Sequence, residues 1–270
     1  LTLLIGANAS GKSNALEALR LLSWMAKGQR LDDILQVLQG ADLALRGALT
    51  DLAFDNQPVF ALGCSLDLEE WRHLTVEIGH NERGLFIQNE SIYRFSYTGA
   101  SVPLYKVVEP ANQFGYDLQV SYNNFSRGGR KPQILCRNQQ AVFTQLTTPA
   151  RFSEGHHKAQ KLIPDVARAF QTALERILFL DPNPSRMRNY SFMIDRTLQS
   201  DGANLSGVLY NLCNSSLHVK NLVLDYIRSL PEQDIQDIGF LEGPRNEVMV
   251  QLLESFGKDR QERAAPLLSD

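Results

Sequence analysis

The sequence is poor in the features that mark several classes of protein. It contains 3 cysteines, Cys64, Cys136 and Cys213, which lie far apart and form no Cys-x-x-Cys pair. A cysteine-based zinc site is therefore not expected, and so sparse and odd a number suits a reducing compartment. No apolar run approaches the ~18 residues that a membrane-spanning helix needs, and no signal segment opens the chain. These absences favour a soluble cytoplasmic protein.

An excess of charge of one sign is lacking as well. The 27 Lys and Arg residues nearly balance the 30 Asp and Glu residues, which leaves a formal net charge of −3. Proteins dedicated to binding polyanions usually carry a strongly basic domain, so this balance argues against that class and leaves room only for a local basic patch. The length of 270 residues and the hydrophobic content of 43% suit one large domain or two small ones with a buried core.

Neither end of the chain resembles a natural terminus. The first residue is not Met, residues 1–5 form the apolar run Leu-Thr-Leu-Leu-Ile, and the chain closes on Leu268, Ser269 and Asp270. We interpret the chain as a fragment that is cut through structure at both ends.

Three zones differ in the period of their hydrophobic residues. From Lys12 to about Leu52 the period is helical, with one helix buried on most sides and a second, amphipathic helix over 31–45. From about Pro58 to Phe143 apolar residues alternate, which is typical of antiparallel strands with one face in water. Strands are expected at 60–68, 74–78 and 116–122, and turns at 80–84, 97–99 and 127–130. Helical patterns return at 166–177, 205–212, 219–230 and 248–256.

One motif carries chemistry. Residues 6–13, Gly-Ala-Asn-Ala-Ser-Gly-Lys-Ser, fit the phosphate-binding loop G-x-x-x-x-G-K-[ST] at every fixed position, between an apolar strand at 1–5 and a buried helix. Gly6 and Gly11 allow backbone conformations that a Cβ would block, so that successive N–H groups point at phosphate oxygens near the positive end of the helix. Lys12 is expected to contact the β- and γ-phosphates, and the Ser13 hydroxyl to coordinate Mg²⁺. The motif predicts binding of a nucleoside triphosphate, or descent from a protein that bound one.

The residues around this loop narrow the family. Residues 4–20 resemble the loop of ABC-type ATPases of the SMC/RecF branch, and especially the AAA-type ATPases grouped with the OLD proteins. That loop reads G-x-N-[GA]-S-G-K-S-N before a Leu-Glu-Ala-Leu helix. Asn8, Ser10, Asn14, Leu16 and Glu17 match it, and Ala9 stands where Gly is commoner. The resemblance assigns nucleotide binding to Gly6, Asn8, Ala9, Ser10, Gly11, Lys12, Ser13 and Asn14, with ATP and Mg²⁺ as cofactors. No Asn-Lys-x-Asp sequence for guanine recognition is present, which weakens a GTPase interpretation.

The resemblance also implies a fold. It is an α/β P-loop NTPase head of ABC/SMC-like type, with an antiparallel β layer and a helical lobe. One head would cover 1–270, with the P-loop strand and helices in 1–56, the β layer in 57–150, and the helical lobe in 151–270 leading to a signature Leu-Ser-x-Gly. Leu268, Ser269 and Asp270 stand where that signature would begin, and Ser269 would approach the γ-phosphate held by Lys12 of a second subunit.

The acids that would complete a hydrolytic site are not recognised in the chain. Asp181 follows four apolar residues, as a Walker B acid does, but Pro182 stands where the family has its catalytic Glu, and the run comes before the signature. Asp225 fails for the same reasons and has helical periodicity. We therefore expect the Walker B Asp and the catalytic Glu beyond residue 270 and the fragment itself to be inactive. The family also uses a Gln on Mg²⁺, for which Gln199 is the candidate and Gln139, Gln140 and Gln145 are competitors.

Weaker signals remain. Two basic clusters, Arg127, Arg130 and Lys131, and Arg186, Arg188 and Arg196, could hold nucleic-acid phosphates, although a solvated hairpin tip or local ion pairs is the simpler interpretation. His156 and His157 have no partner at metal-ligand spacing and are expected in a surface loop.

The function implied by the resemblance is ATP binding and Mg²⁺-dependent hydrolysis that drives dimerisation of two heads. Such a head would serve DNA repair or maintenance, or anti-phage defence beside a nuclease or other effector, with DNA as a further partner and no membrane. The alternative is a nucleotide-gated scaffold that binds ATP with little or no hydrolysis and organises an effector. A membrane-transporter ATPase subunit is a third and weaker interpretation.

Overall fold

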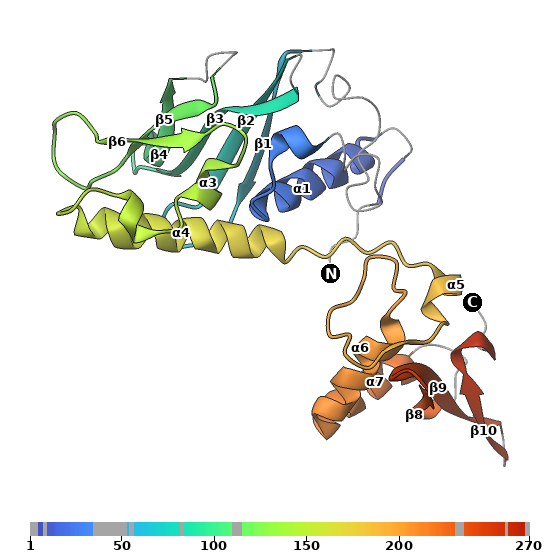
Figure 1. The fold of residues 1–270 in the computed structure, drawn as a ribbon. Coiled ribbons are helices and arrows are strands. Elements are labelled where there is room, and N and C mark those ends of the chain that lie inside the picture. The colour runs from blue at the N-terminus through green and yellow to red at the C-terminus, as the bar shows by residue number, and fades with distance from the viewer. Residues whose placement is uncertain are drawn as a thin grey trace. The chain divides into compact units, whose positions relative to one another are not determined.

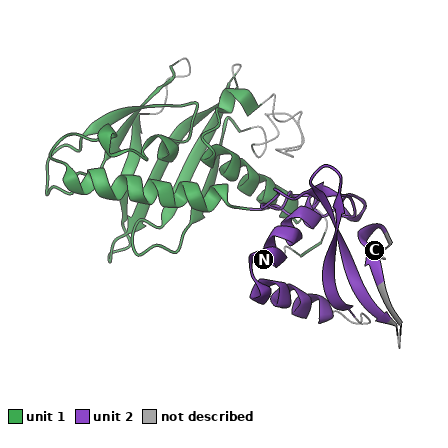
Figure 2. Ribbon diagram, turned by 60° about the horizontal axis from the view of Figure 1, so that its bottom comes forward, with its two compact units in different colours: residues 1–177 green, residues 178–270 purple. Residues whose placement is uncertain are grey.

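The computed structural model describes residues 5–7, 10–34, 53, 57–81, 84–109, 115–229, 235–256 and 259–267 (Figure 1). The chain divides into two compact units, Leu1–Ile177 and Leu178–Asp270 (Figure 2). Residues 1–4 of the expected strand at 1–5 and most of the expected helix at 31–45 lie outside the described residues. No helix of the described residues is both long and apolar enough to cross a membrane.

Unit 1 is built on a six-stranded antiparallel sheet in which each strand pairs with the next along the chain. The strands are β1 (Val59–Ser65), β2 (His73–Asn81), β3 (Gly84–Phe95), β4 (Ser101–Glu109), β5 (Asp117–Tyr122) and β6 (Gln133–Arg137). The alternation over 58–143 therefore predicted the right kind of sheet. The turns expected at 97–99 and 127–130 join β3 to β4 and β5 to β6.

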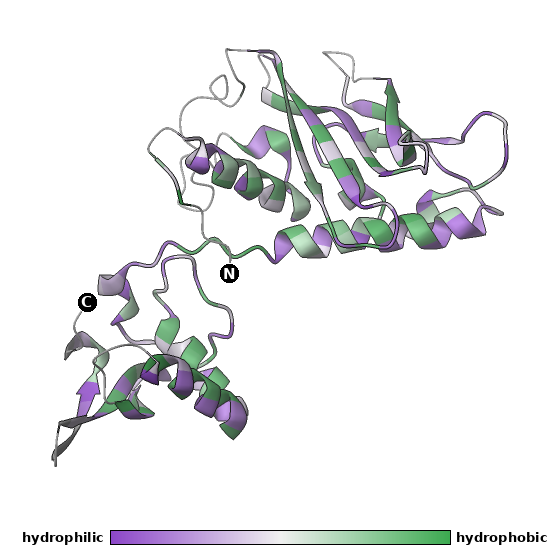
Figure 3. Ribbon diagram, turned by 180° about the vertical axis from the view of Figure 1, so that it is seen from behind, coloured by the Kyte–Doolittle hydropathy of each residue, from purple (hydrophilic) through white to green (hydrophobic). Residues whose placement is uncertain are grey.

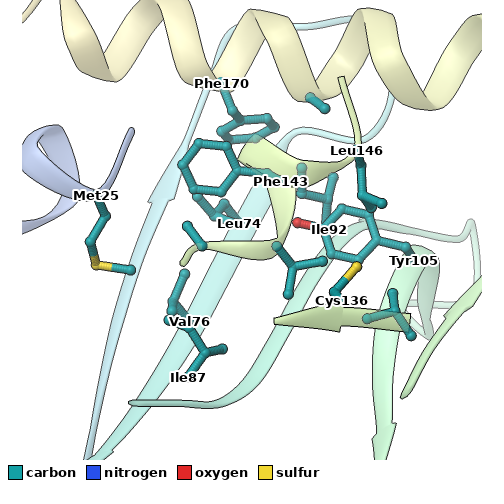
Figure 4. Close-up of a cluster of buried hydrophobic side chains, with 14 of the residues drawn as sticks. Met25, Leu74, Val76, Ile87, Ile92, Tyr105, Cys136, Phe143, Leu146 and Phe170 are labelled. Carbon is teal, nitrogen blue, oxygen red and sulfur yellow. The ribbon is translucent and has the colours of Figure 1, made fainter. Parts of the chain in front are cut away.

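The helices of unit 1 lie against one face of this sheet (Figure 1). They are α1 (Lys12–Ala26), α3 (Val142–Gln145) and α4 (His157–Glu175), with 3-10 turns at Leu31–Asp33 and Pro149–Arg151. Hydrophobic and hydrophilic residues alternate around α4 in Figure 3, which is the pattern of a helix with one buried face. Figure 4 shows the result: Met25 of α1, Phe143 of α3 and Phe170 of α4 meet Leu74 and Val76 of the sheet in one core.

The sheet register is not regular. It shifts between Glu77 and Ile78 in the β2–β3 pair, where Glu77 faces Asn89 and Ile78 faces Ile87. Gln88 is thus an extra residue in β3, which is the definition of a β-bulge. Further shifts interrupt the β3–β4 and β4–β5 pairs.

Unit 2 combines helices with a second antiparallel sheet. Its elements are α5 (Pro184–Met187), β7 (Ser191–Phe192), α6 (Leu205–Ser215), α7 (Leu217–Arg228), β8 (Ile235–Gly243), β9 (Glu247–Phe256), β10 (Asp259–Ala264) and a 3-10 turn at Ala265–Leu267. Strand β9 pairs with β10, β7 and β8. Leu224 of α7 and Ile235, Ile238 and Val250 of the sheet belong to one small core.

The expected helix at 248–256 is wrong, and the range 151–270, expected as a helical lobe, also contains the strands β7 to β10. The segment 248–256 lies in strand β9. Its apolar run, Val-Met-Val-Gln-Leu-Leu, is short and nearly continuous, and periodicity cannot distinguish such a run in a helix from one in a central strand. The helices expected at 166–177, 205–212 and 219–230 are present as α4, α6 and α7, although α4 begins earlier, at His157.

Candidate functional site

The Lys12 ammonium lies across the loop that precedes α1. Its Nζ atom donates to the carbonyl oxygens of Gly6 and Ala7 at 2.7 and 2.5 Å and lies 3.2 Å from Ser10 Oγ. An ammonium carries three N–H donors, so these contacts join the beginning of the loop to its far end. The side chain thereby holds a positive charge where residues 6–13 are expected to receive phosphate.

The two motif glycines are needed for different reasons. Gly11 adopts φ 83° and ψ 4°, a left-handed conformation, at the N-cap of α1, and a Cβ built there would meet nothing within 4 Å. Glycine is needed at position 11 because other residues rarely adopt this backbone conformation, and not for lack of space. A Cβ on Gly6 would instead lie 3.2 Å from Ser10 Oγ and 3.8 Å from Lys12 Nζ. Gly6 leaves room at the centre of the loop, beside the Lys12 ammonium.

The first turn of α1 is open. Its N-cap residue is Gly11, which has no side chain that could cap the helix, and the turn contains no acidic residue. Ser13 and Asn14 are exposed to solvent. The N-terminal end of a helix carries a partial positive charge and N–H donors, both of which favour an anion. Asn8 and Ala9, which we assigned to nucleotide binding, lie outside the described residues.

The other end of α1 is fixed in the core. Its last residues, from Leu21 to Ala26, are all buried. Gln140 Nε2 donates to the Gly28 carbonyl oxygen at 2.7 Å, and Leu31 N donates to the Gln139 carbonyl oxygen at 2.8 Å. The expectation of a helix buried on most sides is therefore correct for this half alone. An open turn on an anchored helix is a rigid place to bind a charged ligand.

These residues fit a nucleoside triphosphate and its metal ion. The space that a Cβ on Gly6 would fill lies next to the Lys12 ammonium, and the exposed Ser13 hydroxyl is an oxygen donor of the kind Mg²⁺ accepts. Lys12 and the start of α1 would hold the phosphates, and Ser13 would hold the ion. The ion itself neutralises phosphate charge during phosphoryl transfer.

Three of the four glutamines considered for the metal site differ in their contacts. In unit 1, Gln145 Oε1 accepts from Arg137 N at 2.8 Å, Gln145 Nε2 donates to the Arg137 carbonyl oxygen at 2.8 Å, and the Gln140 amide holds Gly28. Both amides are therefore engaged in structural contacts. Gln199 belongs to unit 2, where its side chain is exposed and its backbone N–H donates to Asn204 Oδ1 at 2.8 Å. Its role on Mg²⁺ stays a prediction.

The two acids rejected as Walker B candidates do not end strands. Asp181 is exposed in a segment that is neither helix nor strand, and its backbone N–H donates to the Ser200 carbonyl oxygen. Asp225 lies on α7, as its helical periodicity predicted. Ser269, the expected signature residue, lies outside the described residues.

Glu90 is a buried acid in β3 that no sequence motif indicated. Its Oε1 atom accepts from Tyr105 Oη at 2.5 Å and from Phe143 N at 2.7 Å, and its Oε2 atom accepts from Val142 N at 2.7 Å. Burial raises the pKa of Glu90 from 4.5 to about 7, against the effect of these three hydrogen bonds. Because it engages the first amides of α3, Glu90 fixes that helix to the sheet. The signal available in the sequence was an acid within an apolar strand pattern.

The weaker candidates have local partners. His156 stands at the N-cap of α4, where its Nδ1 atom lies 2.8 Å from Tyr122 Oη, and His157 begins the helix. No group of three potential metal ligands occurs in the part of the chain that the structure describes. Arg186 forms an ion pair with Asp201 at 2.5 Å, as the local-pair interpretation of that basic cluster predicted.

Comparison with known proteins bears on the P-loop half of the chain. Residues 1–149 match the family model described as "AAA domain, putative AbiEii toxin, Type IV TA system". Neither the curated proteins nor the solved structures that were compared give a match. The matched residues contain the loop, α1 and the six-stranded sheet, and they make up more than half of the chain. By its loop, its antiparallel sheet and this match, the chain belongs to that family of AAA-type P-loop ATPase domains.

Proposed function

We propose that the chain is an ATP-binding and Mg²⁺-dependent ATP-hydrolysing head of the ABC/SMC-like type, related to the OLD proteins, which acts in the cytoplasm as a nucleotide-driven dimer. The observation that carries the proposal is the Lys12 ammonium held across the loop by Gly6, Ala7 and Ser10, in front of an open helix start. A fixed cation beside helix N–H donors is suited to a polyphosphate.

Removal of the ammonium tests ATP binding. Truncating one partner of a charge-assisted contact costs about 2–5 kcal/mol, so Lys12→Ala should weaken binding of a fluorescent ATP analogue by at least about 30-fold. Lys27→Ala is the matched control, because Lys27 is an exposed lysine at the other end of the same helix. Equal affinity for Lys12→Ala and Lys27→Ala, with both variants folded, would show that the loop does not bind ATP.

Hydrolysis and dimerisation need a second measurement. Phosphate release per subunit should rise with protein concentration if two heads complete one site. A rate that stays constant down to concentrations at which the protein is monomeric would refute the dimer. Binding without phosphate release would instead identify a nucleotide-gated scaffold.

The process that the head drives is proposed on the family alone. The toxin–antitoxin description of the matched family supports anti-phage defence with a nuclease or other effector partner, and the resemblance to SMC and RecF proteins supports DNA maintenance or repair. Survival of phage-infected cells that carry wild-type or Lys12→Ala protein separates the two. Defence predicts that protection is lost with Lys12, whereas a role in repair predicts sensitivity to DNA damage.

A further inference from the structure

The charges of the protein are unevenly distributed. Residues 118–164 contain seven Lys and Arg residues and a single acid, Glu154, although the chain as a whole carries a net charge of −3. The remainder of the chain therefore has a clear excess of Asp and Glu over Lys and Arg. A basic segment within an acidic protein is the usual electrostatic footprint of a polyanion-binding surface.

The fold brings four of these cations to one end of unit 1. Arg127 and Arg130 lie in the β5–β6 loop, and Lys158 and Lys161 lie on the first turns of α4, which adjoin that loop (Figure 1). Lys158 Nζ lies 4.7 Å from the centre of the Phe125 ring, which joins the two segments directly. We call Arg127, Arg130, Lys158 and Lys161 the basic tip.

Hydrogen bonds hold the two segments that carry the basic tip in fixed positions. Tyr122 Oη lies 2.8 Å from His156 Nδ1, which holds the end of β5 against the start of α4. Lys131 Nζ lies 3.1 Å from both Asn124 Oδ1 and the Ser126 carbonyl oxygen, inside the loop. Lys131 therefore organises the loop, while the four cations of the basic tip are exposed to solvent.

The basic tip lacks acidic partners. Within residues 115–229 and the other described parts of the chain, no ion pair involves any of its four members. Several other exposed cations of unit 1 do form ion pairs, for example Arg72 with Asp67 and Arg168 with Asp165, each at 2.6 Å. Unneutralised cations on a rigid support attract phosphates, whereas paired ones have little net field.

We propose that the basic tip binds the phosphate backbone of a nucleic acid. Long cationic side chains on a loop and an adjoining helix contact successive phosphates without reading the bases, so binding should be independent of sequence and sensitive to salt. The inference does not rest on ATP binding, because the tip lies at the opposite end of α4 from α1 (Figures 1 and 2).

Binding of a short fluorescein-labelled duplex DNA, measured without nucleotide, tests the proposal. Arg127→Ala/Arg130→Ala and Lys158→Ala/Lys161→Ala should each weaken binding by about 10-fold at about 100 mM salt. Each should also reduce the slope of log K against log salt by up to about 2. The paired residues give the matched control, Arg72→Ala/Arg168→Ala, which should change neither. An unfolding midpoint equal to that of the wild type shows that the variants are folded and keeps the outcome separate from the test of Lys12.

Further ligands sharpen the result. Single-stranded DNA and duplex RNA of the same length show which nucleic acid the basic tip prefers, and loss of any of them in the tip variants supports the proposal. Equal affinity and equal salt slope in tip and control variants would overturn it. Binding of vesicles containing an anionic lipid, with no binding of any nucleic acid, would overturn it as well.

Discussion

Helices α1 and α6 begin in opposite ways. The first turn of α1 is exposed, its N-cap residue Gly11 has no side chain that could cap it, and Lys12 lies across the loop in front of it. The first turn of α6 is buried, and the segment 189–204 uses its donors: Gly207 N donates to Ser191 Oγ at 2.6 Å and Leu205 N to the Gly202 carbonyl oxygen at 2.9 Å. The same backbone chemistry thus binds either an outside anion or the chain itself. The environment of the first turn decides between ligand binding and stability.

The sealed start of α6 gives the largest expected effect. A Cβ on Gly207 would lie 2.2 Å from the Phe192 carbonyl oxygen, so Gly207→Ala must displace backbone. We expect a loss of about 3 kcal/mol in the stability of unit 2. Hydrogen exchange followed by mass spectrometry should show lost protection in residues 189–215. The exposed Asn214→Ala on the same helix is the control, and equal protection in both variants would mean that α6 is not sealed as described.

The start of α3 is bound by Glu90, and this contact should make the stability of the protein depend on pH. The native Glu90 carboxyl keeps its proton up to about pH 7, whereas the unfolded chain releases it near 4.5. The folded state therefore binds more protons between these values, and stability should fall as pH rises from 4.5 to 7, by about 3 kcal/mol. Chemical denaturation at several pH values should show this fall in the wild type and not in Glu90→Gln. Parallel profiles for the two proteins would contradict it.

Substitutions in the loop before α1 should change the affinity for ATP more than the stability of the fold. Gly6→Ala places a methyl group beside Ser10 Oγ without backbone strain and should weaken ATP binding about 10-fold with little change in the unfolding midpoint. Gly11→Ala forces alanine into a left-handed conformation and should also cost about 1 kcal/mol of stability. If Gly6→Ala destabilised the fold as much as Gly11→Ala, the two glycines would not have the separate roles assigned to them.

The smallest effect is expected at Asp181. Its exposed side chain stands in a segment that is neither helix nor strand, and its backbone N–H donates to the Ser200 carbonyl oxygen. Asp181→Asn should leave the rate of ATP hydrolysis within a few-fold of wild type in a phosphate-release assay. A loss of a hundredfold with the fold intact would identify Asp181 as the metal-binding acid after all.

Features that depend on local sequence rules were predictable, and features that local patterns do not record were not. The loop at 6–13 follows from local rules, because its glycines and lysine are required wherever such a loop occurs. Strands β1, β2 and β5 follow from alternation. Strand β9 was mistaken for a helix because its apolar run is nearly continuous, and such a run lacks the alternation that would distinguish a strand from a buried helix. Glu90 was missed for another reason: its partners Val142 and Phe143 lie some fifty residues away, and no local pattern records them.

The extra residue Gln88 changes which side chains of β3 face the core. Before it, the odd-numbered residues Leu85 and Ile87 face the core; after it, the even-numbered Glu90 and Ile92 do. With regular pairing, the Glu90 carboxylate would project into water, and the amides of α3 would lose their acceptor. A single extra residue in the strand therefore places the Glu90 side chain on the core face of the sheet instead of the solvent face, without any substitution of a hydrophobic residue. An insertion or deletion near position 88 would then alter the inside of unit 1 more than most substitutions on its surface.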